Sequence, residues 1–427
     1  MNRISRCLVV FLFVLTSILR GAEKTPSLIA IKGARIIPVT SADIPSGVIL
    51  IKDGLIEAVG PEVAIPEGAA VIEAPGLIAY PGLIDCYSTL GLAEIGQMPQ
   101  TVDFRELGRI NPQLRAWEAL RPDSMHIPIA RANGITAALV APSGGLISGQ
   151  SGLVRLTGWT PTEMLIKAPV AMHVDLPSMG RPGFQRPAAA AGAEPSQPFK
   201  ELEEAFRRAR AYEKQKEYAE KARWPALPDF NEADEFLQPV LRGEIPLWIS
   251  VHSDKDIKEA IQFVHKEKLK AVLYAVTQGW KCVEEIQKSG LPVVFAPLTN
   301  MPASWEDGYD ALYRTPALLA QAGVKIAFSS QSSSAAKDLP YHAAKAAAFG
   351  LDKREALKAV TINAAEILGV AGRMGSLEKG KAANIVLADG DILDFKTQIK
   401  KVFIDGRDTD LNTIYEQLLE KFKKRND

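Results

Sequence analysis

Seven polar or aromatic side chains fall at the predicted ends of strands, where they would be available for chemistry. They are Tyr87, Thr89, Arg155, His173, His252, Tyr274 and Gln331. Because side chains alternate along a strand, Tyr87 and Thr89 are expected to point to the same side. Two histidines, phenols, a hydroxyl and an amide can line a polar pocket for a small ligand. They do not supply the three protein ligands plus water of an ordinary catalytic zinc, so no metal site is predicted.

Each of these side chains also has a purely structural interpretation. The histidines can be hydrogen-bonded residues at a barrel mouth, and the tyrosines can fill space with their hydroxyls satisfied locally. Arg155 either pairs with a carboxylate such as Asp175 or holds a substrate carboxylate. Asp85 is expected to serve the turn after the first barrel strand. The residues alone leave both interpretations open.

A glycine-rich segment, residues 142–151, follows the second predicted strand. Its glycines allow close backbone approach to a ligand, and its amides could form an anion-binding nest, although a plain flexible loop fits equally well. The chain has no G-x-S-x-G motif, which argues against a serine hydrolase with a nucleophile elbow.

Eight short and almost wholly apolar stretches alternate with helical segments in the middle of the chain. This pattern predicts parallel β/α units and a (β/α)₈ TIM-type barrel, an α/β fold whose chemistry lies at the C-terminal strand ends. A doubly wound open sheet competes, but no glycine-rich phosphate loop follows the first strand. The predicted strands are 82–87, 136–141, 153–157, 170–175, 247–252, 271–275, 293–297 and 325–330.

Short β-hairpins occupy both ends of the chain, with Asp-Gly turn signals such as Asp53-Gly54. We therefore expect residues 27–80 and 375–410 to build one small β-sandwich domain. The barrel then spans 81–374, with a helical insertion at 176–245 and a final helix at 411–427. Within the insertion, residues 199–223 read as a charged helix with a thin apolar stripe, either a solvated face or a partner-binding helix.

Residues 1–22 have the layout of a secretory signal peptide, with Arg3 and Arg6 before an apolar run at 7–19. An uncleaved anchor is the alternative. We expect an exported protein, periplasmic or secreted, with no transmembrane span after signal removal. Two cysteines would then remain, Cys86 and Cys282, and their spacing does not establish a disulfide.

The charge balance argues against nucleic acid or an anionic membrane as a partner. Lys plus Arg and Asp plus Glu each total 50, so the chain has no net charge that would attract a polyanion. Apolar residues make up 47%, as in an ordinary globular protein.

Three motifs resemble the amidohydrolase superfamily. Residues 80–85 (YPGLID) are similar to the motif that opens its first barrel strand. Residues 356–369 (ALKAVTINAAEILG) and 373–381 (RMGSLEKGK) look like its closing helix and the return to the sandwich. The resemblance is closest to the imidazolonepropionase-like and prolidase-like branch, and it covers essentially everything after the signal peptide.

The resemblance implies a zinc or other divalent metal site that this chain does not reproduce. The superfamily places two histidines after strand one, further histidines at strands five and six, and an aspartate at strand eight. The corresponding positions here are Tyr87 and Thr89, then His252, Ala275 and Gln331. Only one histidine position is kept, and no lysine stands at an obvious strand end to bridge two metals.

Three functions are therefore open. The resemblance implies a hydrolase of C–N bonds, of non-peptide or dipeptide amides, with a non-standard metal site. The residues themselves favour a non-catalytic barrel that binds a small-molecule amide, cyclic amide or peptide. The charged insertion helix favours a subunit that forms homo- or hetero-oligomers with amidohydrolases.

Overall fold

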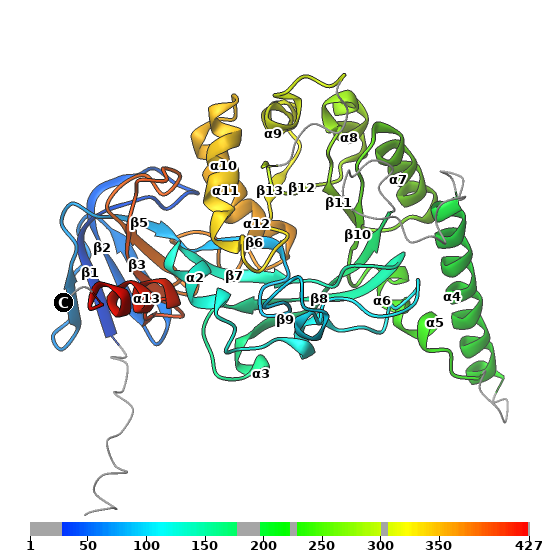
Figure 1. The fold of residues 1–427 in the computed structure, drawn as a ribbon, viewed down its shortest axis with the longest axis horizontal. Helices are drawn as coiled ribbons and strands as arrows, with labels where there is room; N and C mark the ends of the chain where they lie inside the picture. Colours follow the sequence, from blue (N-terminus) through cyan, green and yellow to red (C-terminus); the bar gives the residue numbers. More distant parts are fainter. Residues whose placement is uncertain (1–27, 177–196, 223–228, 300–305, 426–427) are drawn as a thin grey trace, which may run out of the picture.

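The computed structural model describes residues 28–176, 197–222, 229–299 and 306–425. The predicted signal peptide lies outside these residues. Within them, no helix is both long and apolar enough to cross a bilayer. The molecule has two sheets, one from both chain ends and one from the middle, with helices outside the second (Figure 1).

The central sheet is a nearly closed barrel of eight strands. From β6 to β13, each strand pairs with the next one in the chain. Most of their residues are buried, as expected for a sheet that is covered on both faces. This confirms the predicted barrel. Its strands are β6 (Leu83–Ser88), β7 (Ile135–Val140), β8 (Ile147–Arg155), β9 (Leu165–Asp175), β10 (Leu247–Ser250), β11 (Ala271–Ala275), β12 (Val293–Phe295) and β13 (Ile326–Phe328).

One barrel strand runs backwards. β8 pairs antiparallel with both β7 and β9, so the prediction of a parallel third strand is wrong. The reason is chain length: only residues 141–146 separate β7 from β8, and a parallel crossover needs a dozen residues or more. The glycine-rich segment at 142–151 is therefore partly loop and partly the start of β8.

The barrel closes without a backbone ladder between its first and last strands. The Ser330 amide donates to Asp85 Oδ1 at 2.9 Å, and the Gln331 amide donates to the Tyr87 carbonyl at 3.0 Å. We call this junction the seam. At the seam, the buried Asp85 side chain therefore supplies a hydrogen bond that strand pairing supplies elsewhere in the barrel.

Both chain ends contribute to the second sheet, in the order β16-β15-β14-β5-β1-β2-β3, with β4 paired to β1. The Ile56 amide donates to the Lys381 carbonyl at 2.8 Å, which ties β3 to the segment before β14. A separate core, including Ile31, Ile49 and Phe403, stabilises this domain. Its strands are β1 (Leu28–Ile36), β2 (Ile44–Lys52), β3 (Leu55–Gly60), β4 (Ala70–Glu73), β5 (Ile78–Pro81), β14 (Ile385–Ala388), β15 (Ile399–Ile404) and β16 (Arg407–Asp408).

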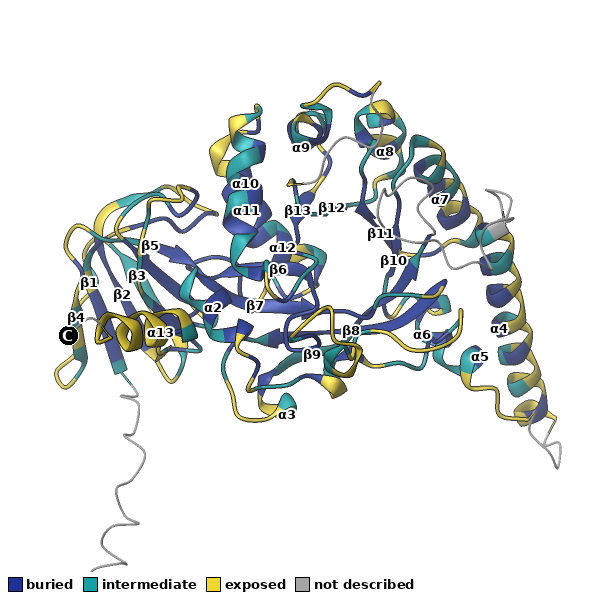
Figure 2. Ribbon diagram, viewed as in Figure 1, coloured by how far each residue is buried: buried dark blue, intermediate teal, exposed yellow. Residues whose placement is uncertain are grey.

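The insertion helix α4 (Gln197–Lys221) packs on the barrel's outer layer through a narrow face. Leu202, Ala205, Phe206 and Ala209 are fully buried, and Phe206 meets Phe263 of α7 with ring centroids 5.7 Å apart. Phe199, Tyr212 and Ala219 are buried as well, and Figure 2 shows the opposite face of α4 exposed. The other helices are α2 (His126–Ala132), α3 (Pro161–Met164), α5 (Glu232–Phe236), α6 (Gln238–Leu241), α7 (Asp254–Glu267), α8 (Val283–Ser289), α9 (Ala311–Gln321), α10 (Leu339–Ala348), α11 (Lys353–Ala359), α12 (Ile362–Ile367) and α13 (Ile414–Lys423).

Candidate functional site

An aromatic cluster fills the barrel interior below the strand ends. It consists of Tyr87, His173, Trp248 and Tyr274, from β6, β9, β10 and β11. Tyr87 stacks on Tyr274 with ring centroids 4.4 Å apart and planes 13° apart, and its hydroxyl donates to the Pro142 carbonyl at 2.8 Å. His173 meets the Tyr87 ring edge-on at 5.3 Å. The position after strand one is thus occupied by a packed phenol.

Burial fixes the charge states of this cluster. Its four side chains are at most 4% exposed. Desolvation raises the pKa of Tyr87 and of Tyr274 well above the ordinary value, so both phenols are neutral at physiological pH. Desolvation also lowers the pKa of His173 to about 3, so its imidazole is neutral as well. The cluster contains no charged group near pH 7.

Three polar atoms of the aromatic cluster have no hydrogen-bond partner among the described residues. They are Trp248 Nε1, His173 Nε2 and the Tyr274 hydroxyl. Ser329 and Gln331 lie close enough to the Tyr274 hydroxyl to oppose the rise in its pKa, without satisfying hydrogen-bond geometry. An unsatisfied buried polar group costs about 1–3 kcal/mol, so stability alone does not account for these polar rings.

The seam is built around Asp85, which is completely buried. Its carboxylate accepts hydrogen bonds from the Ser330 amide and hydroxyl and, at 3.3 Å, from the Tyr87 amide. Burial raises the pKa of Asp85 to about 7, although the Ser330 bonds oppose that rise. The expectation that Asp85 serves the strand-one turn covers only the Tyr87 contact, since its main contacts cross to the end of β13.

A serine-rich segment, residues 329–334, holds the other side chains at the end of β6. Ser88 donates to the Ser332 carbonyl at 3.0 Å, and the Thr89 hydroxyl lies 3.2 Å from that of Ser333. Ser333 in turn donates to the Thr89 carbonyl at 2.6 Å. The hydroxyl at the second position after strand one is therefore engaged in the seam.

The remaining predicted mouth residues, His252 and Gln331, are partly exposed. His252 Nδ1 lies 3.2 Å from the Thr277 hydroxyl. The backbone beside them is strained: φ is +71° at Ala275, +31° at Val276 and +57° at Gln331. Left-handed φ values are uncommon at residues with a Cβ, and a β-branched valine is an outlier there; they indicate local backbone strain.

Asp175 belongs to the mouth, although we had expected it only as a partner for Arg155. Its Oδ2 accepts from the Gly144 amide at 2.7 Å and from the Ser148 hydroxyl at 3.1 Å. The glycine-rich loop does bind an anion, but that anion is the protein's own carboxylate. Its place at the end of β9 was the sequence signal that could have identified it.

Arg155 lies away from the mouth, because β8 is reversed and its last residue pairs with the beginning of β7 at Ala137. Its Nη1 forms an ion pair with Asp405 at 2.7 Å. It lines a cavity of about 930 Å³ between β8 and the terminal sheet domain, together with Trp159 and Arg373. Arg155 therefore does not line the mouth pocket, whereas its predicted pairing with a carboxylate is present, with Asp405 in place of Asp175.

The residues present do not fit the divalent metal that the resemblance implies. Tyr87 is a neutral phenol committed to a stack and a hydrogen bond, and Thr89 is bound to Ser333. Ala275 has no ligand atom, and Gln331 is an amide. Within the described ranges, no three His, Cys, Asp or Glu side chains converge as metal ligands. Hard cations and zinc both require more anionic or imidazole donors than this mouth offers.

A β/α barrel with its polar mouth at the strand ends, joined to a sheet domain built from both termini, is the architecture of a class of hydrolases. Residues 306–409 match the model of the amidohydrolase family. That match covers the last barrel strand, its following helices and the return to the terminal sheet.

Solved structures extend the similarity to almost the whole chain. An amidohydrolase from Thermotoga maritima MSB8 is 26% identical, with a TM-score of 0.78, over 90% of this chain and 99% of its own. A prolidase complexed with N-methylphosphonate-L-proline shares the fold, at 15% identity and a TM-score of 0.53, over 90% of this chain and 99% of its own.

Amidohydrolase tasK of Hapsidospora irregularis is 22% identical over 398 residues, which is 84% of this chain. The chain spans about two fifths of the length of that relative (39%). Taken together, these matches show that residues 306–409 resemble the amidohydrolase family and that nearly the whole chain is similar to amidohydrolases in sequence and fold.

Proposed function

We propose that this protein is an amidohydrolase-superfamily member that binds a small amide, cyclic amide or peptide at its barrel mouth without the superfamily's metal-dependent hydrolysis. The observation that carries the proposal is the stacked Tyr87–Tyr274 pair, anchored by the Tyr87 bond to Pro142. Its two neutral rings occupy the first ligand position itself, at Tyr87, and the barrel interior beside it. A water molecule there would have no metal to lower its pKa.

The strained strand ends support retention of a binding role. Ala275, Val276 and Gln331 keep left-handed backbone conformations beside His252 at the mouth. Such conformations cost about 1–3 kcal/mol each, and they persist where the surrounding structure needs them. Imidazole, amide and hydroxyl groups on this rim are suited to the N–H and C=O groups of an amide ligand.

The decisive experiment combines metal analysis with ligand binding. Protein purified without chelators is expected to contain well under one equivalent of zinc, iron or manganese. Dipeptides and hydantoin-like cyclic amides are expected to raise its melting temperature, because a ligand that binds only the native state stabilises it. Gln331→Ala should reduce that rise, whereas His265→Ala, an exposed histidine on α7, should leave it unchanged.

Two results would overturn the proposal. One is near-stoichiometric metal that disappears in His252→Ala. The other is amide hydrolysis at a rate that depends on added zinc or manganese and is lost in the same variant. A melting temperature insensitive to every amide tested would also count against a binding mouth.

Hydrolysis of C–N bonds remains the second candidate, and the similarity to the Thermotoga maritima amidohydrolase over nearly the whole chain favours it. It requires a route that does not use the superfamily's ligand set. Turnover of a panel of N-acyl amino acids and dipeptides by chelator-treated protein would support it, provided that an activity-negative His252→Ala variant still folds.

Export is part of the same proposal. Its support is the positive start and the apolar run of residues 7–19. N-terminal sequencing of the protein recovered from the native compartment should begin after residue 21 or 22, and an intact Met1 would contradict export by cleavage.

A further inference from the structure

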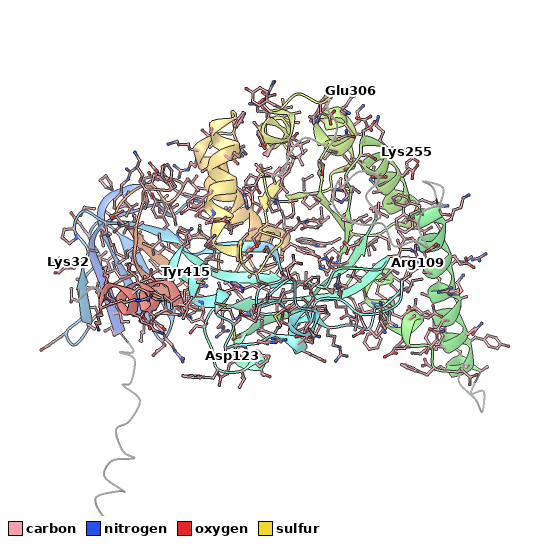
Figure 3. All side chains as sticks on the ribbon, in the orientation of Figure 1. Lys32, Arg109, Asp123, Lys255, Glu306 and Tyr415 are labelled. Carbon is pink, nitrogen blue, oxygen red and sulfur yellow. The ribbon has the colours of Figure 1, made fainter. Side chains whose placement is uncertain are left out.

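Helix α13 is exposed at every residue but its first, Ile414, which is partly exposed. None of its residues, Ile414–Lys423, is buried, although a capping box at Thr413 and Glu416 starts the helix firmly. Its other large apolar residues are exposed; Figure 2 colours most of the helix as exposed, and Figure 3 marks the position of Tyr415 on it. We call them the α13 stripe: Tyr415 (56% exposed), Leu418 (39%), Leu419 (54%) and Phe422 (53%).

The stripe has the spacing of a single helical face. Its members lie at i, i+3, i+4 and i+7, the pattern of a helix that buries one side. A ten-residue helix is about 15 Å long and is shorter than the roughly 12–15 residues that make an isolated helix even marginally stable in water. Because this chain buries none of its residues, α13 needs a cover from outside the described fold.

We propose that the α13 stripe packs against the α13 stripe of a second copy of this chain, antiparallel and around a two-fold axis. An axis between Leu418 and Leu419 places each of these leucines opposite the other in the second copy. The same axis places Tyr415 of each copy opposite Phe422 of the other. The stripe is thus self-complementary in size, which a two-fold interface requires.

Charge complementarity supports a second copy in this orientation. Glu416 and Lys423 flank the stripe on the same side, because seven residues are close to two helical turns. Within one helix they lie about 10 Å apart along the axis, too far to pair with each other. Glu416 accepts from Thr413 in the capping box, and Lys423 lies 3.5 Å from the exposed Glu420. Antiparallel pairing brings Glu416 to within about 3 Å, along the axis, of Lys423 in the second copy, and the symmetry makes this pair twice. It also sets the positive end of each helix dipole beside the negative end of the other.

The size of the stripe limits the strength of this association. A stable interface buries about 800 Å² on each partner, which is more than one ten-residue helix offers. We therefore expect a reversible, concentration-dependent dimer. Figure 1 shows α13 on the terminal sheet domain, at the end of the molecule opposite α4, so pairing leaves the barrel mouth accessible.

Sedimentation velocity of the full chain, over a range of protein concentration, tests the proposal. The wild type is expected to shift from monomer to dimer with increasing concentration. Leu419→Glu should weaken the dimer at least about tenfold, as for a central interface residue. Tyr218→Glu, at an exposed tyrosine (70%) of α4, is the matched control and should leave the equilibrium unchanged.

Two further variants test the charge pairing. Glu416→Gln keeps a side-chain acceptor for the capping box but removes the charge, and Lys423→Gln removes its partner. Each single variant should weaken the dimer, and the effect should be larger at low salt. The loss of dimer affinity in the double variant should not exceed the sum of the two single losses. Since α13 buries nothing in its own chain, Leu419→Glu should not lower the melting temperature of the monomer.

A wild type that stays monomeric at concentrations on the order of 100 μM, where even weak complexes form, would overturn the proposal. So would a dimer that Leu419→Glu leaves intact. Binding of the monomer to vesicles of phosphatidylglycerol, lost in Leu419→Glu, would assign the stripe and its neighbouring Lys421 and Lys424 to a lipid surface instead.

Discussion

Replacing Asp85 by asparagine is expected to make the protein more stable than the wild type near neutral pH. The buried carboxylate has a pKa of about 7, against an ordinary value of 3.8. A group whose pKa is higher in the folded state holds its proton more tightly there. Its contribution to stability is therefore complete below about pH 4 and is lost as the pH rises through 7.

The size of the effect follows from these two values. They differ by about three pH units, and each unit corresponds to about 1.4 kcal/mol, so the free energy of unfolding should fall by about 4 kcal/mol between pH 4 and pH 7.5. An asparagine side chain does not titrate, so Asp85→Asn lacks this component. The carbonyl of the introduced amide can still accept from the Ser330 and Tyr87 amides, while its NH₂ group donates to the Ser330 hydroxyl, which can accept as well as donate.

Denaturant unfolding of the wild type and Asp85→Asn, at half-unit steps from pH 4 to 8, measures the difference directly. Every other titrating group is common to both proteins and cancels. A difference that stays constant over this range would refute the raised pKa. Asp85→Ala is the second arm: it also lacks the titrating group but leaves two buried amides without an acceptor, so it should be about 2–5 kcal/mol less stable than Asp85→Asn at every pH. If alanine were tolerated as well as asparagine, Asp85 would not hold the seam.

Other variants test the remaining parts of the structure. Tyr274→Phe removes a buried hydroxyl without a described partner and should be neutral or stabilising by up to about 1 kcal/mol in denaturant unfolding. Tyr87→Phe breaks a hydrogen bond and should cost about 1–2 kcal/mol. Equal effects of the two variants would contradict the assigned hydrogen bonds. The His173 ring should show neutral-imidazole NMR shifts from pH 4 to 8, and titration near pH 6.5 would contradict its burial. A double-mutant cycle of Arg155→Ala and Asp405→Ala should give a coupling of about 0.5–1 kcal/mol that decreases with salt, because both side chains are partly exposed; no coupling would mean that the ion pair does not form in solution.

The fold was accessible from the sequence because its signals are local. Short apolar stretches predict most of the barrel strands within a few residues, although β8 and β9 begin five or six residues earlier than predicted. Asp53-Gly54 marks a hairpin in which Asp53 adopts a φ of +49°. The reversal of the third strand was accessible too, since the predicted strands 136–141 and 153–157 leave only eleven residues between them, fewer than a parallel crossover needs. It was missed because the glycines of that segment suggested a ligand loop.

The candidate site was only partly accessible. The alternation of side chains along each strand predicts that Tyr87, His173 and Tyr274 point into the barrel. The structure brings these three residues into one cluster. Trp248 was missed, although it stands two residues before Ser250 and four before His252 on the same side of strand five. The role of Asp85 could not be seen, because its partner Ser330 is 245 residues away and no local pattern marks the pair.

That separation has a kinetic consequence. Bringing together residues 245 positions apart costs chain entropy that no local contact repays, so closure of the seam should be among the last events of folding. Until the segment after β13 is in place, β6 presents an unpaired edge that can associate with other chains. During synthesis this edge waits while a further 245 residues, more than half of the 427-residue chain, are made. The yield of folded protein should therefore depend on how well the edge is protected from aggregation during that interval.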